Sequence, residues 1–179
     1  MSSVYRNILV AVDGSPDGEA ALMHAGALAR DQRARLTLLT AIPPVPATAL
    51  LATGAAPPRS EVVRHYDDLL RQAAATLPED VSVTTLLVEG PPAKALIERS
   101  RSGAFDLIVM GSHGHGRLHT TLLGCVSQKV LHASPIPVLL TRAPREEPAP
   151  VRVLADVTSL PPMAFWMVVI SNSPLGCLA

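Results

Sequence analysis

The residues that decide the fold are DLIVM (106–110) and the run that follows them, GSHGHGRLHTTLLGCVS (111–127). The first run is short and almost wholly apolar, as in a strand that is buried on both faces of a sheet. The second run is rich in glycine and leads into a helix predicted over residues 124–132. A buried strand that passes through a glycine-rich loop into a helix is typical of sites that bind phosphate.

The backbone of this loop suits it to an anion. Glycine permits positive φ and lets the main chain approach a ligand with no Cβ in the way. The start of the helix adds N–H groups that have no partner within the helix, and a dipole that favours negative charge. We expect the amides of Gly124, Cys125 and Val126 to receive the phosphates. A turn without a ligand is the alternative interpretation of the same glycines.

Strands and helices alternate along the rest of the chain. Besides 106–110, apolar runs rich in branched residues predict strands over residues 7–12, 36–42, 81–88 and 136–141. The first helix is expected to start at Pro16 with Ser15 as its N-cap, because serine and proline favour those two positions. The remaining helices are predicted over residues 60–77, 92–101 and 124–132.

This alternation predicts an α/β fold, a doubly wound, Rossmann-like, five-stranded parallel sheet with helices on both faces. The expected strand order is 3-2-1-4-5, and Pro137 indicates an edge position for the last strand. In such sheets a ligand binds beyond the carboxyl ends of the strands, where the strand order reverses. Asp13, which follows the first strand, and Gly111, which follows the fourth, would then face one crevice.

Three motifs in this order resemble the universal stress protein family over roughly residues 4–142. The first is ILVAVDGS (8–15), and the second is the loop spacing of Gly111, two residues, Gly114, nine residues and Gly124. The third comprises VSQKVL (126–131) and SPIPVL (134–139). The loop spacing is similar to the ATP-binding motif of that family.

The resemblance implies an ATP-binding protein that acts as a nucleotide-dependent regulator in stress response, with Mg²⁺ accompanying the nucleotide. It also implies a homodimer that forms through the last strand, Val138 to Thr141. Asp13 and Ala41 would border the adenine and the ribose. The ribose and phosphate side would be lined by Gly111, Ser112, His113 and Gly114, and the phosphates would be received by Gly124, Cys125, Val126 and Ser127.

Cys125 departs from the family pattern, in which ATP binders carry serine or threonine at this position. A thiol is a weaker hydrogen-bond donor than a hydroxyl. Loss of one such bond costs about 0.5–1.5 kcal/mol, which weakens ATP binding without abolishing it because the backbone amides remain. We expect Cys125 to be a small packing residue, and a reactive thiolate at the helix N-terminus is the alternative.

Composition narrows the class of protein. Of the 179 residues 48% are apolar but only 3% are aromatic, so the core is expected to consist of aliphatic side chains. Lys plus Arg and Asp plus Glu both number 15, and this balance argues against a nucleic-acid partner. The late apolar run 163–170 is too short to span a membrane. The two cysteines are too few for a disulfide framework, which favours a reducing compartment. We therefore predict a soluble cytoplasmic protein.

The predicted domain organisation has three parts. Residues 1–143 form the nucleotide-binding domain, and residues 144–150 form a proline-rich linker. Residues 151–179 are an apolar extension, for which a docked strand, a partner segment and a disordered tail all stay open.

Other functions compete with the nucleotide-dependent regulator. The main alternative is a dimeric, stress-related scaffold that binds no nucleotide, which Cys125 favours. An enzyme that activates a substrate with ATP is a further alternative, but the segment after the first strand lacks the glycine-rich loop of such enzymes. No catalytic residue is assigned, and we expect at most slow hydrolysis of ATP. No metal site is expected from His113, His115 and His119, because no cysteine or carboxylate lies at ligand spacing from them.

Overall fold

The computed structural model describes residues 4–44, 57–114 and 123–144. All of them lie within a unit that spans Met1–Pro144, and a second unit spans Arg145–Ala179. Three groups of residues named in the sequence predictions fall outside the described residues: His115 and His119 of the loop, the linker beyond residue 144, and the extension at 151–179.

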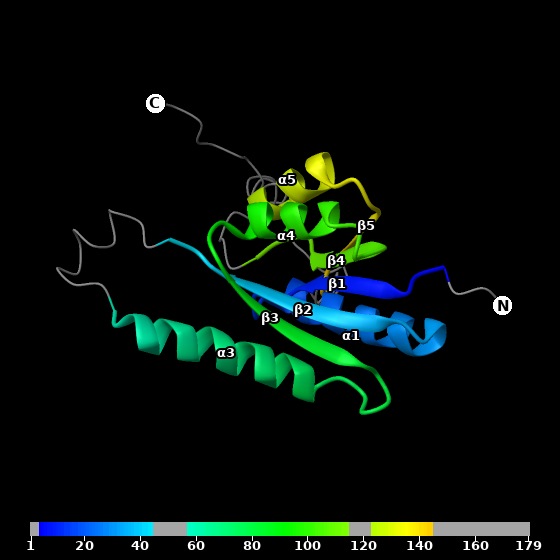
Figure 1. Cartoon of the computed structure of the whole chain (residues 1–179), viewed down its shortest axis with the longest axis horizontal. Coiled ribbons are helices and arrows are strands. Elements are labelled where there is room, and N and C mark those ends of the chain that lie inside the picture. Colours follow the sequence, from blue (N-terminus) through cyan, green and yellow to red (C-terminus); the bar gives the residue numbers. More distant parts are fainter. Residues whose placement is uncertain (1–3, 45–56, 115–122, 145–179) are drawn as a thin grey trace, which may run out of the picture. The chain divides into compact units, whose positions relative to one another are not determined.

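Five parallel strands form one sheet in the order β3-β2-β1-β4-β5, which confirms the predicted fold (Figure 1). β1 pairs with β2 on one side and with β4 on the other, so the strand order reverses between β1 and β4. The edge position predicted for the last strand is also confirmed. The strands are β1 (Asn7–Ala11), β2 (Arg35–Ile42), β3 (Val83–Glu89), β4 (Leu107–Gly111) and β5 (Val138–Thr141).

Four helices connect these strands in the described part of the chain. Ser15 caps the first of them, as predicted, because its hydroxyl accepts a hydrogen bond from the Gly18 amide at 3.1 Å. That helix is closed by its C-cap, Arg33, which adopts the left-handed conformation with φ 54°. The helices are α1 (Pro16–Gln32), α3 (Arg59–Ala75), α4 (Pro92–Arg101) and α5 (Cys125–Ala133). α1 begins at the predicted residue, and the ends of the other three lie within two residues of those predicted from the sequence.

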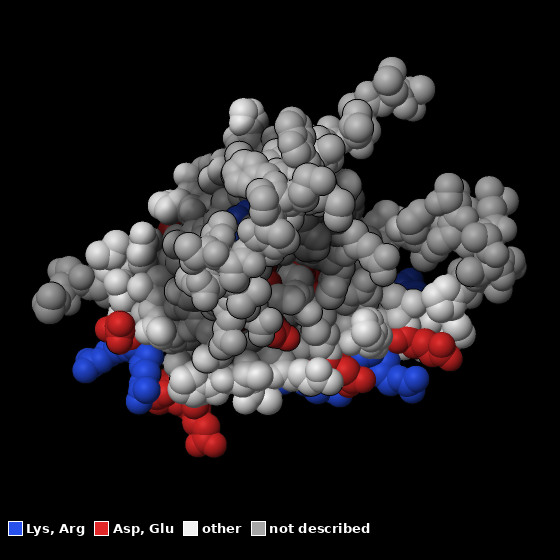
Figure 2. Space-filling view, turned by 180° about the vertical axis from the view of Figure 1, so that it is seen from behind, with Lys and Arg blue, Asp and Glu red and all other residues white. Residues whose placement is uncertain are grey.

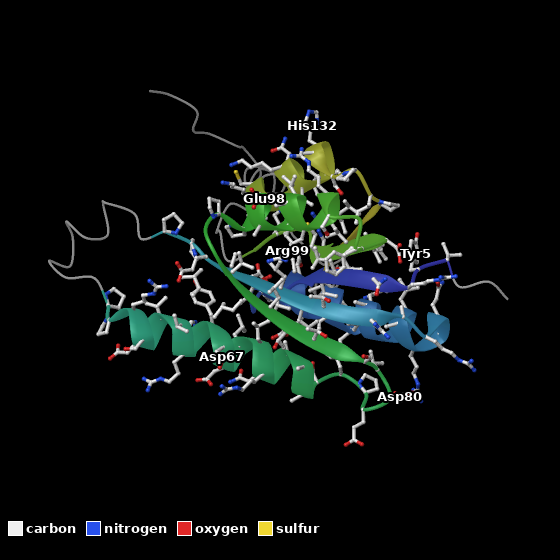
Figure 3. The ribbon with its side chains drawn as sticks, in the orientation of Figure 1. Tyr5, Asp67, Asp80, Glu98, Arg99 and His132 are labelled. Carbon is white, nitrogen blue, oxygen red and sulfur yellow. The ribbon has the colours of Figure 1, made fainter. Side chains whose placement is uncertain are left out.

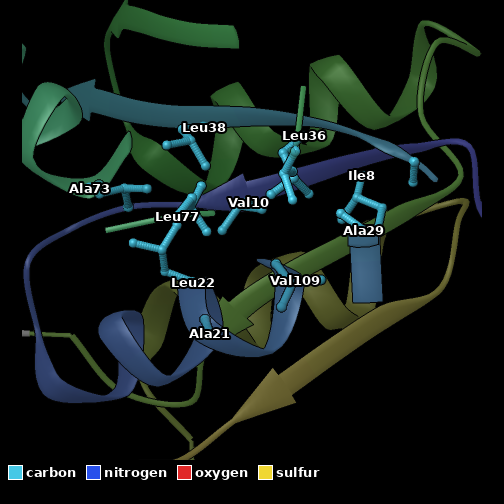
Figure 4. Close-up of a cluster of buried hydrophobic side chains, with 14 of the residues drawn as sticks. Ile8, Val10, Ala21, Leu22, Ala29, Leu36, Leu38, Ala73, Leu77 and Val109 are labelled. Carbon is cyan, nitrogen blue, oxygen red and sulfur yellow. The ribbon is translucent and has the colours of Figure 1, made fainter. Parts of the chain in front are cut away.

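The helices cover both faces of the sheet, because alternate residues of each strand point to opposite sides. On one face, Ile8 and Val10 of β1 pack in a cluster with residues of α1 and α3 (Figure 4). On the other face, Leu9 packs with residues of α4 and α5. Aliphatic side chains fill both clusters, as the composition predicts, and Figure 1 shows α4 and α5 on the side of the sheet opposite α3.

The outer surfaces of the helix layers carry mixed charge. Figure 3 shows Asp67 of α3 and His132 of α5 on opposite sides of the sheet. On the face seen in Figure 2, basic and acidic side chains lie next to one another along the lower edge. Exposed ion pairs such as Arg30–Asp80, at 2.9 Å, contribute little to stability. No helix in the described ranges is long and apolar enough to cross a bilayer.

Candidate functional site

A cavity of about 570 Å³ opens where the strand order reverses, at the carboxyl ends of β1, β2 and β4. Its walls come from the ends of these strands, the starts of α4 and α5, and one residue of α3, Tyr66. The volume lies within the range of about 300–1,000 Å³ that is common for sites that bind small molecules. The crevice therefore lies where the parallel sheet predicts a ligand.

All but one of the residues predicted for the site line this cavity. The exception is Ser112, which is buried and donates its hydroxyl proton to Asp17 of α1 at 2.6 Å. The predicted residues that do line the cavity are Asp13, Ala41, Gly111, His113, Gly114, Gly124, Cys125, Val126 and Ser127. The fold thus gathers segments that are distant in sequence, and their role in binding stays a prediction.

The start of α5 forms the side of the cavity that is suited to an anion. Gly124 is the N-cap, and its amide donates to the Ser112 carbonyl at 2.8 Å, so it is not available to a phosphate as the sequence suggested. The amides of Cys125, Val126 and Ser127 occupy the first three helical positions, where no intrahelical acceptor exists. These three N–H groups, with the helix dipole, form the part of the cavity wall best suited to an anion.

The Ser127 hydroxyl is already engaged. It lies 2.9 Å from the Gly111 carbonyl and 3.0 Å from the Ser112 carbonyl, and the side chain is buried. This contact ties the first turn of α5 to the end of β4. Ser127 can therefore offer its amide to a ligand, while its hydroxyl holds the helix against the sheet.

The glycines of the loop act through close approach, and not through positive φ. None of Gly111, Gly114 and Gly124 adopts positive φ. A Cβ on Gly111 would lie 2.7 Å from the main chain of α1, so this glycine lets the helix pack directly on β4. A Cβ on Gly114 would lie 2.8 Å from a carboxylate oxygen of Asp13. The first of these glycines thus serves the fold, and the second lets the loop approach Asp13 at the cavity wall.

Ser15 joins the segment after β1 to the segment after β4. Its amide and its hydroxyl both lie within hydrogen-bond distance of Asp13 Oδ1, at 3.0 and 2.7 Å. The same hydroxyl lies 3.2 Å from the carbonyl oxygen of His113. These contacts fix the Asp13 carboxylate at the cavity wall and hold it beside the glycine loop.

Asp17, in the first turn of α1, gathers a second set of contacts behind the cavity wall. One carboxylate oxygen accepts from the Ser112 hydroxyl at 2.6 Å and from the His113 amide at 3.0 Å. The other oxygen accepts from the Ala143 amide at 3.0 Å. Thr141 of β5 adds a bond from its hydroxyl to the Asp17 carbonyl at 3.1 Å. One residue of α1 thus ties the end of β4 to the segment after β5.

The charge of Asp17 is stabilised by these donors. Burial alone would raise its pKa, but the hydrogen bonds from Ser112, Ala143 and His113 outweigh burial and hold the pKa of Asp17 below its usual range. His113 Nδ1 lies 3.4 Å from the carboxylate, and both side chains are mostly buried, with 13% and 14% of their surface exposed. Asp17 is therefore a carboxylate at neutral pH with a structural role in this loop.

Several lining residues could not be identified from the sequence. Pro43, Pro92 and Leu96 lie at the ends of elements whose relative positions depend on the sheet order. Tyr66 belongs to α3, and nothing in its sequence context shows that it reaches the carboxyl edge of the sheet. Gln128 directly follows the predicted site residues, so extending the predicted site by one residue along the helix would have included it.

Metal ligands do not gather in the described residues. No group of three His, Cys, Asp or Glu side chains is close enough to hold a metal ion there. Among the described residues that line the cavity, Asp13 is the sole carboxylate. Cys125 is free within the described part of the chain, and it is exposed, so the packing role expected from the sequence is wrong.

Comparisons with known proteins agree with this architecture. A profile described as "Universal stress protein family" matches residues 4–142. A universal stress protein of Thermus aquaticus is 34% identical over 145 residues, which cover 78% of this chain and 100% of the relative. Among solved structures, universal stress protein UspA from Lactobacillus plantarum is 26% identical with a TM-score of 0.62, covering 77% of this chain and 98% of that one.

A second solved structure has a ligand. A universal stress protein in complex with cAMP is 27% identical with a TM-score of 0.55, and the match covers 79% of this chain and 100% of that one. The profile match and the similarity to the Thermus aquaticus protein each extend over more than two thirds of the chain. The chain therefore belongs to the universal stress protein family.

Proposed function

We propose that this chain is a nucleotide-dependent regulator of the stress response that binds ATP in the cavity between the ends of β1 and β4. The observation that carries the proposal is the start of α5, where three main-chain amides without intrahelical acceptors meet a cavity of about 570 Å³. A solved relative that binds cAMP supports a nucleotide as the ligand. The nucleotide-binding domain in this proposal comprises residues 1–143.

Each part of the nucleotide has a matching part of the cavity. The phosphates would be held by the amides of Cys125, Val126 and Ser127, which need no charged side chain to stabilise an anion. The ribose would lie beside His113 and Gly114. The adenine and the ribose would be bordered by Asp13 and Ala41, as the family resemblance implies.

A magnesium ion fits this arrangement when it arrives with the nucleotide. Mg²⁺ is usually held by one or two carboxylates together with phosphate oxygens and water. Asp13 could supply the one carboxylate, and the phosphates would supply the other ligands. Asp13 is engaged by Ser15 and would be taken up by the magnesium ion, and Gln128 is exposed on α5, so neither residue is placed to orient an attacking water. We accordingly expect at most slow hydrolysis.

Equilibrium titration with ATP and Mg²⁺ tests the proposal. We expect saturable binding below millimolar concentration, and loss of that binding in Gly114→Val, because the branched side chain would displace the Asp13 carboxylate and narrow the cavity. Ala104→Val is the matched control, since it adds the same type of side chain at an exposed position outside the cavity wall. Absence of saturation in the unmodified protein would favour the scaffold without nucleotide, for which Cys125 is the main argument.

The outer edge of β5 is the proposed dimer contact. β5 is an edge strand of the described sheet, and Leu139 within it is 38% exposed. A second large apolar side chain, Leu131 of α5, is 48% exposed. Exposed strand edges pair readily with a second copy of the same strand. Light scattering should report a dimer, and Leu139→Lys should convert it to a monomer.

A further inference from the structure

Tyr66 continues the buried stripe of α3 beyond the hydrophobic core. Tyr66, Leu70 and Ala73 follow one another at spacings of four and three residues, so they share one face of the helix. Leu70 is 1% exposed and Ala73 is 8% exposed, and both belong to the core cluster on this side of the sheet. Tyr66 is only partly buried, and it lines the cavity.

The position of Tyr66 follows from the direction of α3. The first turns of this helix lie at the carboxyl edge of the sheet, where Arg59 forms an ion pair with Glu89 at the end of β3. The Gly90 amide donates to the Ile42 carbonyl at 2.9 Å, which joins the ends of β3 and β2. Tyr66 therefore reaches the cavity from the side of β2.

The sheet order separates this side of the cavity from the phosphate side. β2 and β4 lie on opposite sides of β1, so their ends are roughly 10 Å apart at the usual strand spacing. The start of α5 follows β4, whereas Ala41 and Pro43 stand at the end of β2 and share the cavity wall with Tyr66. A nucleotide with its phosphates at α5 would extend its base toward β2.

We infer that Tyr66 stacks its ring on the base of the bound nucleotide and so contributes to selection for a ligand with an aromatic base. This inference rests on the proposed function. Among the described lining residues, Tyr66 and His113 carry aromatic rings, and His113 is held beside Asp17 on the β4 side. The Tyr66 ring lies edge-to-face with the ring of the exposed His65, and the two ring centroids are 5.3 Å apart.

Three substitutions separate stacking from simple space filling. Tyr66→Phe keeps the π face, Tyr66→Leu keeps a large apolar side chain without a π face, and Tyr66→Ala removes both. Loss of a base-stacking contact weakens binding by about 5- to 150-fold. We therefore expect ATP affinity to stay within about twofold in the Phe variant, and to fall by about 5-fold or more in the Leu and Ala variants.

Calorimetric titration of the full chain with ATP and Mg²⁺ provides the test, and thermal unfolding of each variant verifies the fold. Arg64→Ala, an exposed change on the same helix, should leave the affinity unchanged. If the unmodified protein binds ATP and the Leu variant binds it equally well, the stacking role is wrong while the proposed function stands. Equal weakening in the Phe and Leu variants would also refute stacking, because it would assign the effect to the hydroxyl. If the unmodified protein binds no ATP, both proposals fail.

Discussion

Asp17 connects three segments around the candidate site, so Asp17→Ala should lower the free energy of unfolding substantially. The substitution removes the acceptor of two backbone amides, those of His113 and Ala143, and of the buried Ser112 hydroxyl. A hydrogen bond to a charged group contributes about 1.5–3 kcal/mol, but water can replace part of these bonds because 14% of the Asp17 side chain is exposed. We expect a loss of about 2–5 kcal/mol in total.

Glu19→Ala is the matched control for this change. Glu19 is also an acidic residue in the first turn of α1, but its side chain is exposed. Its interaction with the helix dipole should contribute no more than about 1 kcal/mol. Asp17→Asn, which keeps an oxygen acceptor but loses the charge, should fall between the two.

Urea unfolding at several pH values completes the test. The pKa of Asp17 is lowered in the folded protein, so its contribution is fully present above the pKa of the unfolded chain and is lost as pH falls through the folded pKa. The difference between wild type and Asp17→Ala should therefore be constant near neutral pH and shrink below about pH 4. A loss no larger than that of Glu19→Ala, or a difference that stays the same in acid, would refute the role assigned to Asp17.

Four further substitutions probe individual contacts of the fold and of the site. Gly111→Ala should cost about 1–3 kcal/mol of stability in thermal unfolding, because the added Cβ would lie 2.7 Å from the main chain of α1. Gly26→Ala should lower stability less than Gly111→Ala, since its Cβ would meet the flexible end of Leu77 and alanine favours the helix by about 1 kcal/mol. Equal losses of stability in the two variants would contradict the packing role of Gly111. Ser127→Ala should destabilise the fold by about 1–3 kcal/mol, because the hydroxyl ties α5 to the end of β4. The ATP affinity measured by calorimetry should stay nearly unchanged, because the Ser127 amide remains. A large loss of affinity would instead show that the hydroxyl contacts the ligand. Asp106→Asn should lower the free energy of unfolding by about 1–2 kcal/mol near neutral pH and by less below about pH 4. The reason is that backbone amides at the start of β1 bind the Asp106 carboxylate and lower its pKa. Urea unfolding that shows the same loss in acid would contradict this expectation.

The fold was predictable because its signals are local. Each strand is a short apolar run, and Ser15 and Pro16 indicate the first residues of α1 before any tertiary contact is known. Pro137 just before β5 indicates an edge, because proline has no N–H to donate and is tolerated in a sheet where that position faces no neighbouring strand. The strand order follows once these elements are recognised as a doubly wound sheet.

The details of the site were less predictable because they depend on where separate elements meet. The sequence cannot show that the Gly124 amide turns back to the Ser112 carbonyl, since this contact requires the loop to close on itself. It also cannot show that Ser112 faces Asp17, because the two residues are 95 positions apart. Tyr66 was missed because the packing of α3 on the sheet, and not the sequence of the helix, decides which of its residues reach the carboxyl edge of the sheet.

An amide NMR titration of the full chain with ATP and Mg²⁺ tests the central claim most directly. We expect the amides of Cys125, Val126 and Ser127 to shift most and to saturate together below millimolar concentration. The amide of Gly124 should shift less, because it already donates to the Ser112 carbonyl. Saturable binding with the main shifts elsewhere, or no saturation at all, would contradict the assignment of the phosphates to the start of α5.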